Sequence, residues 1–380
     1  MNTVNVSYRT LASGCLLLLY GVMSGCSTPV SPISSSEPSQ KIEKIQKKKI
    51  ITIAAVGDLM LGTNFPTDRL APKDGSNLLS QVSPYLSQAD ITFGNLEGVL
   101  LDGGEPAKKC KNLQACYVFR SPSVYADHFK TAGFDVMSLA NNHARDFGED
   151  GRTSSMEALA VVGIHHTGRI NDIASWEVEN IKIAFIAYAP FGGSFDLLDI
   201  PLAQKQVEAL AATHDIVVVS MHAGAEGAGV ERVPFAREMF HGENRGDVVA
   251  FSHAVVDAGA DLVLGHGPHV PRALELYKNR LIAYSLGNFC TYYGIRITGN
   301  NGLAPILQSN LSSDGEFLSG RIISTKQTRP VGNVLDSSHR AAKLIADLTR
   351  LDFPGTNLSI SPQGEISIKT TPSENRLLNR

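Results

Sequence analysis

The stretch IITIAAVGD, residues 50–58, sets a nearly unbroken apolar run directly before a glycine and an aspartate. The run from Ile50 to Val56 is typical of a strand that is covered on both faces. Asp58 then stands where the strand ends. In an open α/β sheet, ligands bind in the crevice beyond the carboxyl ends of the strands. The stretch therefore predicts a buried strand that ends in a polar side chain at a crevice.

Similar short runs recur along the chain, and each is followed by a polar or glycine-containing turn. They are residues 91–93, 134–139, 181–188, 216–220, 262–264 and 281–285. Stretches with helical periodicity lie between them, at residues 77–88, 124–132, 151–162, 202–212 and 247–258. This alternation predicts an α/β fold with helices outside the sheets. Later runs at 320–325 and 358–368 predict further β-structure near the C-terminus.

The N-terminus is interpreted as a secretion signal. Arg9 precedes the apolar run at residues 16–23, which closes with Ser24, Gly25 and Cys26. A transmembrane anchor is the alternative, but the run is shorter than the ~20 apolar residues that a spanning helix needs. Residues 1–25 are therefore predicted to be a lipoprotein signal peptide, with Cys26 as the lipidated first residue. Ser27 favours the periplasmic face of the outer membrane if the cell is Gram-negative.

The remaining chain is divided by composition. Residues 26–49 are rich in Ser, Pro and Lys, which predicts a flexible tether. Residues 50–330 are predicted to form the main domain, and residues 331–380 a C-terminal extension packed on it. Cys110 and Cys116 flank five residues, so a disulfide between them would close a small loop in an oxidising compartment.

The polar residues that follow the predicted strands share one location, the carboxyl ends. They are Asp58, Asn95, Glu97, Asn141, Asn142, His143, His222, His266 and His269. Taken singly, these residues have ordinary explanations: a Gly-Asp turn, a helix cap, or a hydrogen-bonded core histidine. Their joint occurrence at corresponding positions favours a metal site. Carboxylates, amide oxygens and imidazoles without thiolates are the ligands of a hydrolytic Zn, Mn or Fe centre.

Two histidines and one aspartate have open roles. His143 and His269 could each bind metal or protonate a leaving group, since imidazole titrates near neutrality. Asp146 follows His143 by three residues and could orient it. The alternative is an acidic charge that stabilises the N-terminus of the helix predicted near residue 151.

A charged segment at residues 242–247 follows the run that ends near His222. Arg245 in this segment, together with Glu226 and Arg272, is interpreted as a rim that selects substrate. A solvated charged loop is the alternative.

Taken together, these motifs resemble the CapA family of capsule synthesis proteins, whose domain is similar to the calcineurin-like metallophosphoesterases. The carrying motifs are VGDLMLG (56–62), FGNLEGVL (93–100), SLANNHARDFGEDG (138–151), MHAGAEG (221–227), ADLVLGHGPHV (260–270) and IAYSLGNF (282–289). They follow one another in the family's order over residues 50–290. The resemblance implies a four-layer α/β/β/α sandwich of the metallo-dependent phosphatase type, with the metal crevice at one end.

The resemblance also implies roles and one or two divalent ions, Mn, Zn or Fe. By it, Asp58 and Glu97 hold or bridge metals, and His143 assists the leaving group. The other implied metal ligands are Asn142, His222, His266 and, with less direct correspondence, His269.

The chain departs from the phosphoesterase pattern in three places. Met60 stands where a histidine is expected, which predicts that one metal position is weakened or lost. His266 and His269 are three residues apart instead of two. Glu97 replaces an aspartate, with Asn95 as a rival ligand or substrate contact.

These features predict an extracytoplasmic, lipid-anchored protein with a metal-dependent hydrolase site of the metallophosphoesterase type. Its expected partner is an anionic envelope polymer of the poly-γ-glutamate type, or the machinery that makes, exports or anchors it. One alternative is a non-catalytic polymer-binding or assembly subunit, and another is a secreted metallophosphodiesterase or nucleotidase. A nucleic-acid partner is disfavoured, because the formal net charge is -3.

Overall fold

The computed structural model describes residues 49–109 and 117–369 of this 380-residue chain. The predicted signal peptide, nearly all of the predicted tether, the lipidation site Cys26 and the disulfide between Cys110 and Cys116 fall outside these residues. Cys290 is buried and free. Within the described ranges, no helix has both the length and the apolar character required to cross a membrane.

The first sheet has nine strands and is built around β1. Its members are β1 (Ile50–Met60), β4 (Ile91–Leu96), β7 (Val136–Ser138), β8 (His165–Thr167), β18 (Asn288–Thr291), β19 (Ile306–Ser312), β20 (Phe317–Ile323), β23 (Leu358–Ile360) and β24 (Glu365–Ile368). They run in the order β23-β24-β20-β19-β1-β4-β7-β8, with β18 also paired to β1. Strands β1, β4, β7 and β8 are parallel neighbours, so their carboxyl ends meet at one edge.

The second sheet has seven strands and repeats this arrangement. Its members are β9 (Ala174–Val178), β10 (Ile181–Ala189), β11 (Phe195–Asp196), β12 (Ile216–His222), β15 (Leu262–His266), β16 (Leu274–Tyr277) and β17 (Arg280–Ala283). They run in the order β11-β10-β12-β15-β17-β16, with β9 on β10. Strands β10, β12, β15 and β17 are parallel, which again gathers carboxyl ends at one edge.

Pairs of short strands form separate two-stranded sheets beside the two large ones. They are β2 (Gly62–Thr63) with β3 (Arg69–Leu70), β5 (Val99–Leu100) with β6 (Arg120–Ser121), β13 (Met239–Phe240) with β14 (Glu243–Asn244), and β21 (Thr325–Thr328) with β22 (Gly332–Leu335).

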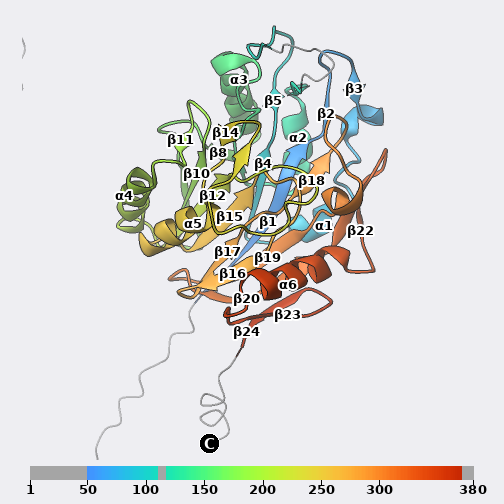
Figure 1. The fold of residues 1–380 in the computed structure, drawn as a ribbon. Coiled ribbons are helices and arrows are strands. Elements are labelled where there is room, and N and C mark those ends of the chain that lie inside the picture. Colours follow the sequence, from blue (N-terminus) through green and yellow to red (C-terminus); the bar gives the residue numbers. More distant parts are fainter. Residues whose placement is uncertain (1–48, 110–116, 370–380) are drawn as a thin grey trace, which may run out of the picture. The chain divides into compact units, whose positions relative to one another are not determined.

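Six α-helices lie in the described residues: α1 (Ser83–Leu86), α2 (Tyr125–Ala132), α3 (Gly148–Val161), α4 (Ile200–Ala211), α5 (Val248–Asp257) and α6 (Arg340–Asp352). Figure 1 shows α4 and α5 beside β10, β12 and β15, and α6 next to β16 and β20.

Alternate residues of each strand enter different cores, because successive side chains point to opposite faces. Ile53 and Phe93 of the first sheet pack against Phe185 and Val218 of the second. The outer face of the first sheet packs on α1, α2 and α3, and the outer face of the second on α4 and α5. This is the four-layer α/β/β/α sandwich, and the fold predicted from the sequence is confirmed.

The C-terminal segment completes the sandwich. Strands β23 and β24 extend the first sheet as a hairpin, where a β-region broken by a turn was predicted. Helix α6 was not predicted. Its residues Ala342 and Ile345 enter the core between the sheets, and the Thr349 hydroxyl oxygen accepts a hydrogen bond from the backbone N–H of Leu274 in β16.

The helix predicted over residues 77–88 was wrong in extent. Only Ser83–Leu86 is α-helical, and residues 76–82 form turns. Pro84 fits this short helix, because proline is tolerated in the first turn but breaks the interior of a longer helix.

Candidate metal centre

Asp58 lies in the last three residues of β1, where the strand is irregular. The pairing of β1 with β18 shifts register between Asp58 and Leu59, and its pairing with β4 shifts after Ala55. A bulge of this kind redirects a side chain out of the strand's alternation. Gly57 permits the bend, since a Cβ there would lie 2.0 Å from the carbonyl oxygen of Gly287. That carbonyl accepts the Asp58 N–H at 2.9 Å.

Asn95 and Glu97 come from the end of β4 and have opposite surroundings. Asn95 Nδ2 donates to Asp58 Oδ1 at 2.8 Å, and Asn95 Oδ1 accepts from Asn141 Nδ2 at 3.1 Å. Glu97 is equally buried, yet among the described residues neither of its carboxylate oxygens has a hydrogen-bond partner. Burial and the charge of Asp58 raise the pKa of Glu97 well above its ordinary value. Asn95 therefore holds Asp58 in place by a hydrogen bond, whereas the two carboxylate oxygens of Glu97 remain available to a metal ion.

The turn after β7 is held by Asn141 and presents Asn142 and His143. Asn141 Nδ2 donates to the carbonyl oxygen of Leu96 at 2.8 Å, and Asn141 Oδ1 accepts the His143 N–H at 3.0 Å. With the turn fixed in this way, Asn142 Oδ1 is buried and has no hydrogen-bond partner in the described chain.

His143 rests against Asp146. The distance from His143 Nδ1 to Asp146 Oδ2 is 2.8 Å, and the same carboxylate oxygen accepts the backbone N–H of Phe119. Helix α3 begins at Gly148 and has no side-chain cap, so Asp146 makes no capping hydrogen bond to it. An ionised carboxylate only accepts, so His143 Nδ1 donates and Nε2 remains for another partner.

His222 and His266 are register partners on β12 and β15. Both rings are buried, and His222 Nε2 and the two ring nitrogens of His266 have no hydrogen-bond partner among the residues described. His266 Nδ1 is 3.5 Å from Asp58 Oδ1, which is too long for a good hydrogen bond. Burial lowers the pKa of His222 well below its ordinary value, so its ring is neutral at pH 7, the form that binds metals.

His269 belongs to the loop after β15, and its side chain lies beside Asp58 and Glu97. Its backbone φ is 58°, in the left-handed region that non-glycine residues seldom adopt. Its Nδ1 lies 2.9 Å from Asp58 Oδ2 and 3.0 Å from Asn288 Oδ1, and its Nε2 lies 3.6 Å from Glu97 Oε1. Burial alone would lower the pKa of His269, but the charges of Glu97 and Asp58 outweigh it and raise the pKa to about 10.

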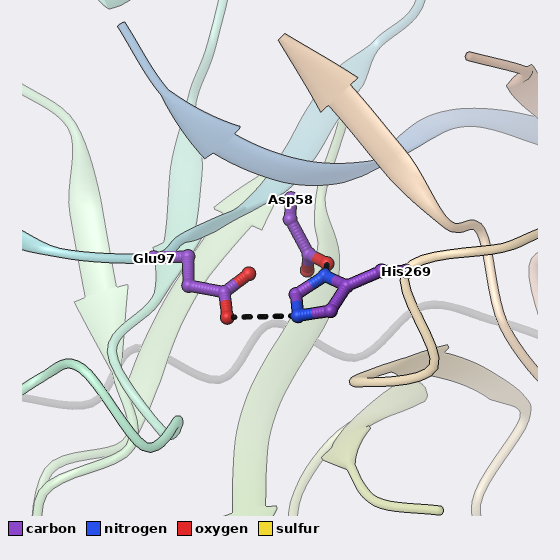
Figure 2. Close-up of side chains that lie close together, drawn as sticks. All are labelled: Asp58, Glu97 and His269. Atoms are coloured by element: carbon purple, nitrogen blue, oxygen red, sulfur yellow. Dashed lines mark hydrogen bonds and ion pairs between the residues drawn. The ribbon is translucent and has the colours of Figure 1, made fainter. Parts of the chain in front are cut away.

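Asp58, Glu97 and His269 form the tightest cluster. One ligand atom from each lies within 4.8 Å of the others. Figure 2 shows the two carboxyl groups turned toward the imidazole of His269. Burial by itself would raise the pKa of Asp58, but the neighbouring imidazoles of His266 and His269 outweigh it and hold the pKa well below the ordinary range. Asp58 is therefore a carboxylate at neutral pH.

Unpartnered polar atoms gather around this cluster. A buried polar atom without a hydrogen bond costs about 1–3 kcal/mol, so folded proteins leave few of them. Among the described residues, those of Glu97, Asn142, His222 and His266 follow the strand ends and that of Asp146 lies behind His143, whereas the others belong to separate elements. Carboxylate, amide and imidazole atoms of this kind suit Zn, Mn or Fe. The residues present therefore fit a divalent metal ion.

A cavity of about 500 Å³ adjoins the cluster, and His269, Asn142 and His143 lie in its wall. Glu226 and Arg245 line it as well. The buried guanidinium of Arg245 donates to Glu226 Oε1 at 2.6 Å and pairs with Glu243 at 2.9 Å. Its Cζ also lies 5.0 Å from the ring centre of Phe191 and 5.2 Å from that of Phe240. The predicted positions of Glu226 and Arg245 at the crevice therefore agree with the structure.

Arg272 does not lie at the rim, and that part of the prediction was wrong. Its guanidinium is fully buried and donates to both carboxylate oxygens of Glu238, at 2.8 and 2.7 Å, and to the carbonyl oxygen of Val230. The pair anchors the segment that carries Glu226 and Arg245. Asn95 also lies outside the cavity wall, because it is buried behind Asp58.

Asn288 was missed in the sequence. It accepts from His269 Nδ1, and its own Nδ2 donates to the backbone carbonyl oxygen of His269 at 3.2 Å. The strand-end rule that selected Asp58 would have found it, since Asn288 follows the apolar run at residues 281–285 through Gly287. The cavity walls Phe119, Phe191 and Phe240 gave no comparable signal.

Comparison with known proteins points to one family. Residues 52–293 match the protein family described as bacterial capsule synthesis protein PGA_cap. Capsule biosynthesis protein CapA of Bacillus anthracis is 28% identical over 333 residues, which cover 81% of this chain and 76% of the relative. PGA biosynthesis protein CapA of Bacillus subtilis is 26% identical over 297 residues, which cover 72% and 70%.

Among solved structures, the NAD nucleotidase of Haemophilus influenzae aligns with 88% of this chain and 60% of its own, at 12% identity and a TM-score of 0.40. This likeness is too low to carry an argument, so the fold is assigned from this chain's own sheets and cores.

Proposed function

This chain belongs to the family of bacterial capsule synthesis proteins, PGA_cap, and from that premise we propose that it acts on an anionic envelope polymer through a divalent-metal centre with hydrolase chemistry. The Bacillus relatives are named for capsule and PGA biosynthesis. The proposed polymer is therefore of the poly-γ-glutamate type, and the proposed step lies in its synthesis, export or anchoring.

One observation carries the metal centre: buried ligand atoms without partners converge beside a cavity. The proposed ligands are Asp58, Glu97, Asn142, His222 and His266, and His269 Nε2 would join them only if a bound ion displaced its proton. A bound Mn, Zn or Fe ion supplies a Lewis acid at the cavity wall.

His143 is proposed to hold the proton that a leaving group takes up. Its Nδ1 is fixed by Asp146, and the side chain lines the cavity. Asp146 is a positioning residue in this proposal, because it sets the ring orientation and the tautomer without lining the cavity.

A chelation and reconstitution assay tests this function. Protein stripped of metal is assayed with Mn²⁺, Zn²⁺ or Fe²⁺ on bis(p-nitrophenyl) phosphate and on purified poly-γ-glutamate. We expect metal to restore hydrolysis of one substrate to the wild type and to His128→Ala, a variant of a histidine on α2 outside the site. We expect no restoration in His222→Ala. Activity that is indifferent to chelation and unchanged in His222→Ala would contradict the proposal.

A non-catalytic polymer-binding or assembly subunit is the second candidate, and the surroundings of Asp58 favour it. Its Oδ1 is already bonded to Asn95 and its Oδ2 to His269. Met60, at the position where the related phosphoesterases carry a histidine, is buried and offers no imidazole. Polymer production that survives His143→Ala but not loss of the protein would select this candidate. No observation favours the nucleotidase alternative.

Membrane anchoring through Cys26 remains part of the proposal. It is supported by the apolar run followed by Ser24-Gly25-Cys26. We expect labelled palmitate to be incorporated into the wild type and not into Cys26→Ser. Equal labelling of both proteins would contradict the proposed lipid anchor.

A further inference from the structure

Arginines from distant segments meet around Tyr293, outside the metal cluster. Arg69 comes from β3, and Arg329 from the turn between β21 and β22. Their guanidinium carbons lie 5.0 and 5.3 Å from the centre of the Tyr293 ring, within the range of cation–π attraction. The two cations therefore share one patch of surface.

Tyr293 is held in an unfavourable backbone conformation. Its φ is 70°, a value that strains a bulky residue, and the residue is 42% exposed. Arg329 Nη2 donates to the carbonyl oxygens of Thr291 and Ile295, at 3.2 and 2.8 Å, and so fixes the loop on both sides of the tyrosine. The fold thus maintains a partly exposed aromatic ring in contact with two cations.

This patch continues into the cavity. Gly294, Ile295 and Arg296 line the cavity wall. Arg296 is exposed, and its Nε donates to the Thr298 hydroxyl at 2.7 Å, which leaves the Nη groups for other partners.

The charge on Arg69 is not neutralised by the residues described. In the ranges 49–109 and 117–369, the guanidinium group of Arg69 has no hydrogen bond or ion pair, and its contact is with the Tyr293 ring. The adjacent Asp68 uses its carboxylate to accept the backbone N–H of Leu70. Arg69 is exposed and so can turn its guanidinium toward a ligand.

We propose that Arg69, Tyr293, Arg296 and Arg329, here called the cationic ledge, bind an extended polycarboxylate chain next to the cavity. This rests on the proposed function, and it adds a subsite beyond the metal centre. Guanidinium groups match carboxylates in a planar, two-bond geometry, and several of them along one surface suit a polymer with repeated carboxylates. The ledge supplies locally the positive charge that the net charge of -3 does not reveal.

Binding of purified poly-γ-glutamate, followed by titration calorimetry at low salt and again at 0.15 M salt, tests the ledge. The test variant is Arg69→Gln with Arg296→Gln, which leaves the loop contacts of Arg329 intact. The matched control is Arg321→Gln with Arg350→Gln, two exposed arginines on β20 and α6. We expect about tenfold weaker binding in the test variant and no change in the control. We also expect the wild type to lose more affinity with added salt than the test variant.

Three results would overturn the ledge: no binding by the wild type, equal binding by the test and control variants, or preferential binding of polyphosphate. His222→Ala separates the two proposals. If His222→Ala still binds the polymer, the ledge is supported even if the metal-centre proposal fails. If His222→Ala loses polymer binding and the ledge variant does not, only the ledge proposal is contradicted.

Discussion

The Arg272–Glu238 pair and the residues around Glu97 are both buried and charged or polar, yet only the first set is complete. Arg272 gives two hydrogen bonds to Glu238 and a third to a backbone carbonyl. Glu97 and His266 have buried ligand atoms with no hydrogen-bond partner within the described chain. A complete cluster holds a loop in place, whereas an incomplete one carries a cost that a bound ion can remove. The difference separates a structural role from a binding role.

Breaking the complete pair has the largest expected effect. Glu238→Ala leaves the buried guanidinium of Arg272 without its carboxylate, and we expect a loss of about 3–5 kcal/mol in the free energy of unfolding. Urea denaturation of the metal-free protein measures it. The double variant Arg272→Met with Glu238→Leu is expected to recover most of this loss. A single variant within about 1 kcal/mol of the wild type would mean that the pair does not hold the fold.

Adding metal has the next largest effect, and it acts on the incomplete cluster alone. An ion present at 100 to 1,000 times its Kd raises the free energy of unfolding by about 2.7–4.1 kcal/mol. We expect this for the wild type, His128→Ala and Arg321→Gln, but not for His222→Ala. Calorimetric melting with and without Mn²⁺ or Zn²⁺ measures the shift. An equal shift in His222→Ala would place the ion elsewhere.

Asp261 is buried but only partly paired, and we expect its contribution to the free energy of unfolding to depend on pH. It accepts the backbone N–H of Val217 at 2.8 Å and pairs with Arg280 at 3.0 Å, yet burial raises its pKa to about 6. Because the folded pKa exceeds the unfolded one, its contribution to stability is full below pH 3.9 and is lost as the pH rises through 6. The gap in stability between wild type and Asp261→Asn should therefore change by about 2–3 kcal/mol between pH 4 and 7. A gap that is constant with pH would refute this.

The smallest effect is expected from Glu97→Gln in metal-free protein. No hydrogen bond is lost, and an isosteric amide is less costly to bury than a carboxylate. We expect a change within about 1 kcal/mol, neutral or stabilising, together with loss of the metal-induced shift. Glu238→Gln serves as the matched comparison and is expected to destabilise. Destabilisation of similar size by both changes would erase the distinction between the clusters.

Much of the fold could be predicted because the local signals agree with it. The apolar runs that end at Asp58, His222 and His266 become the central strands, and the helices between them cover the outer faces. Helix α6 was missed although its sequence has helical periodicity, with Ala341, Ile345 and Leu348 buried on one face. The helix over residues 77–88 failed where Pro84 limited it.

The site was predictable to the level of the strand ends and no further. Position after a strand selected Asp58, Glu97 and His222, but the same rule did not separate Asn95, whose atoms are used by Asp58 and Asn141, from a free ligand. Arg272 looked like a rim residue because its partner Glu238 is far away in sequence. Pairing across loops depends on three-dimensional contacts that a linear pattern does not contain.

The most direct measurement is the metal stoichiometry of the purified protein by mass spectrometry, after chelation and re-addition of Mn²⁺, Zn²⁺ and Fe²⁺. We expect one or two ions per chain in the wild type and in His128→Ala, and fewer ions in Glu97→Gln with His222→Ala. An equal metal content in all three proteins, or none in the wild type, would contradict the claim that the incomplete cluster is a metal site.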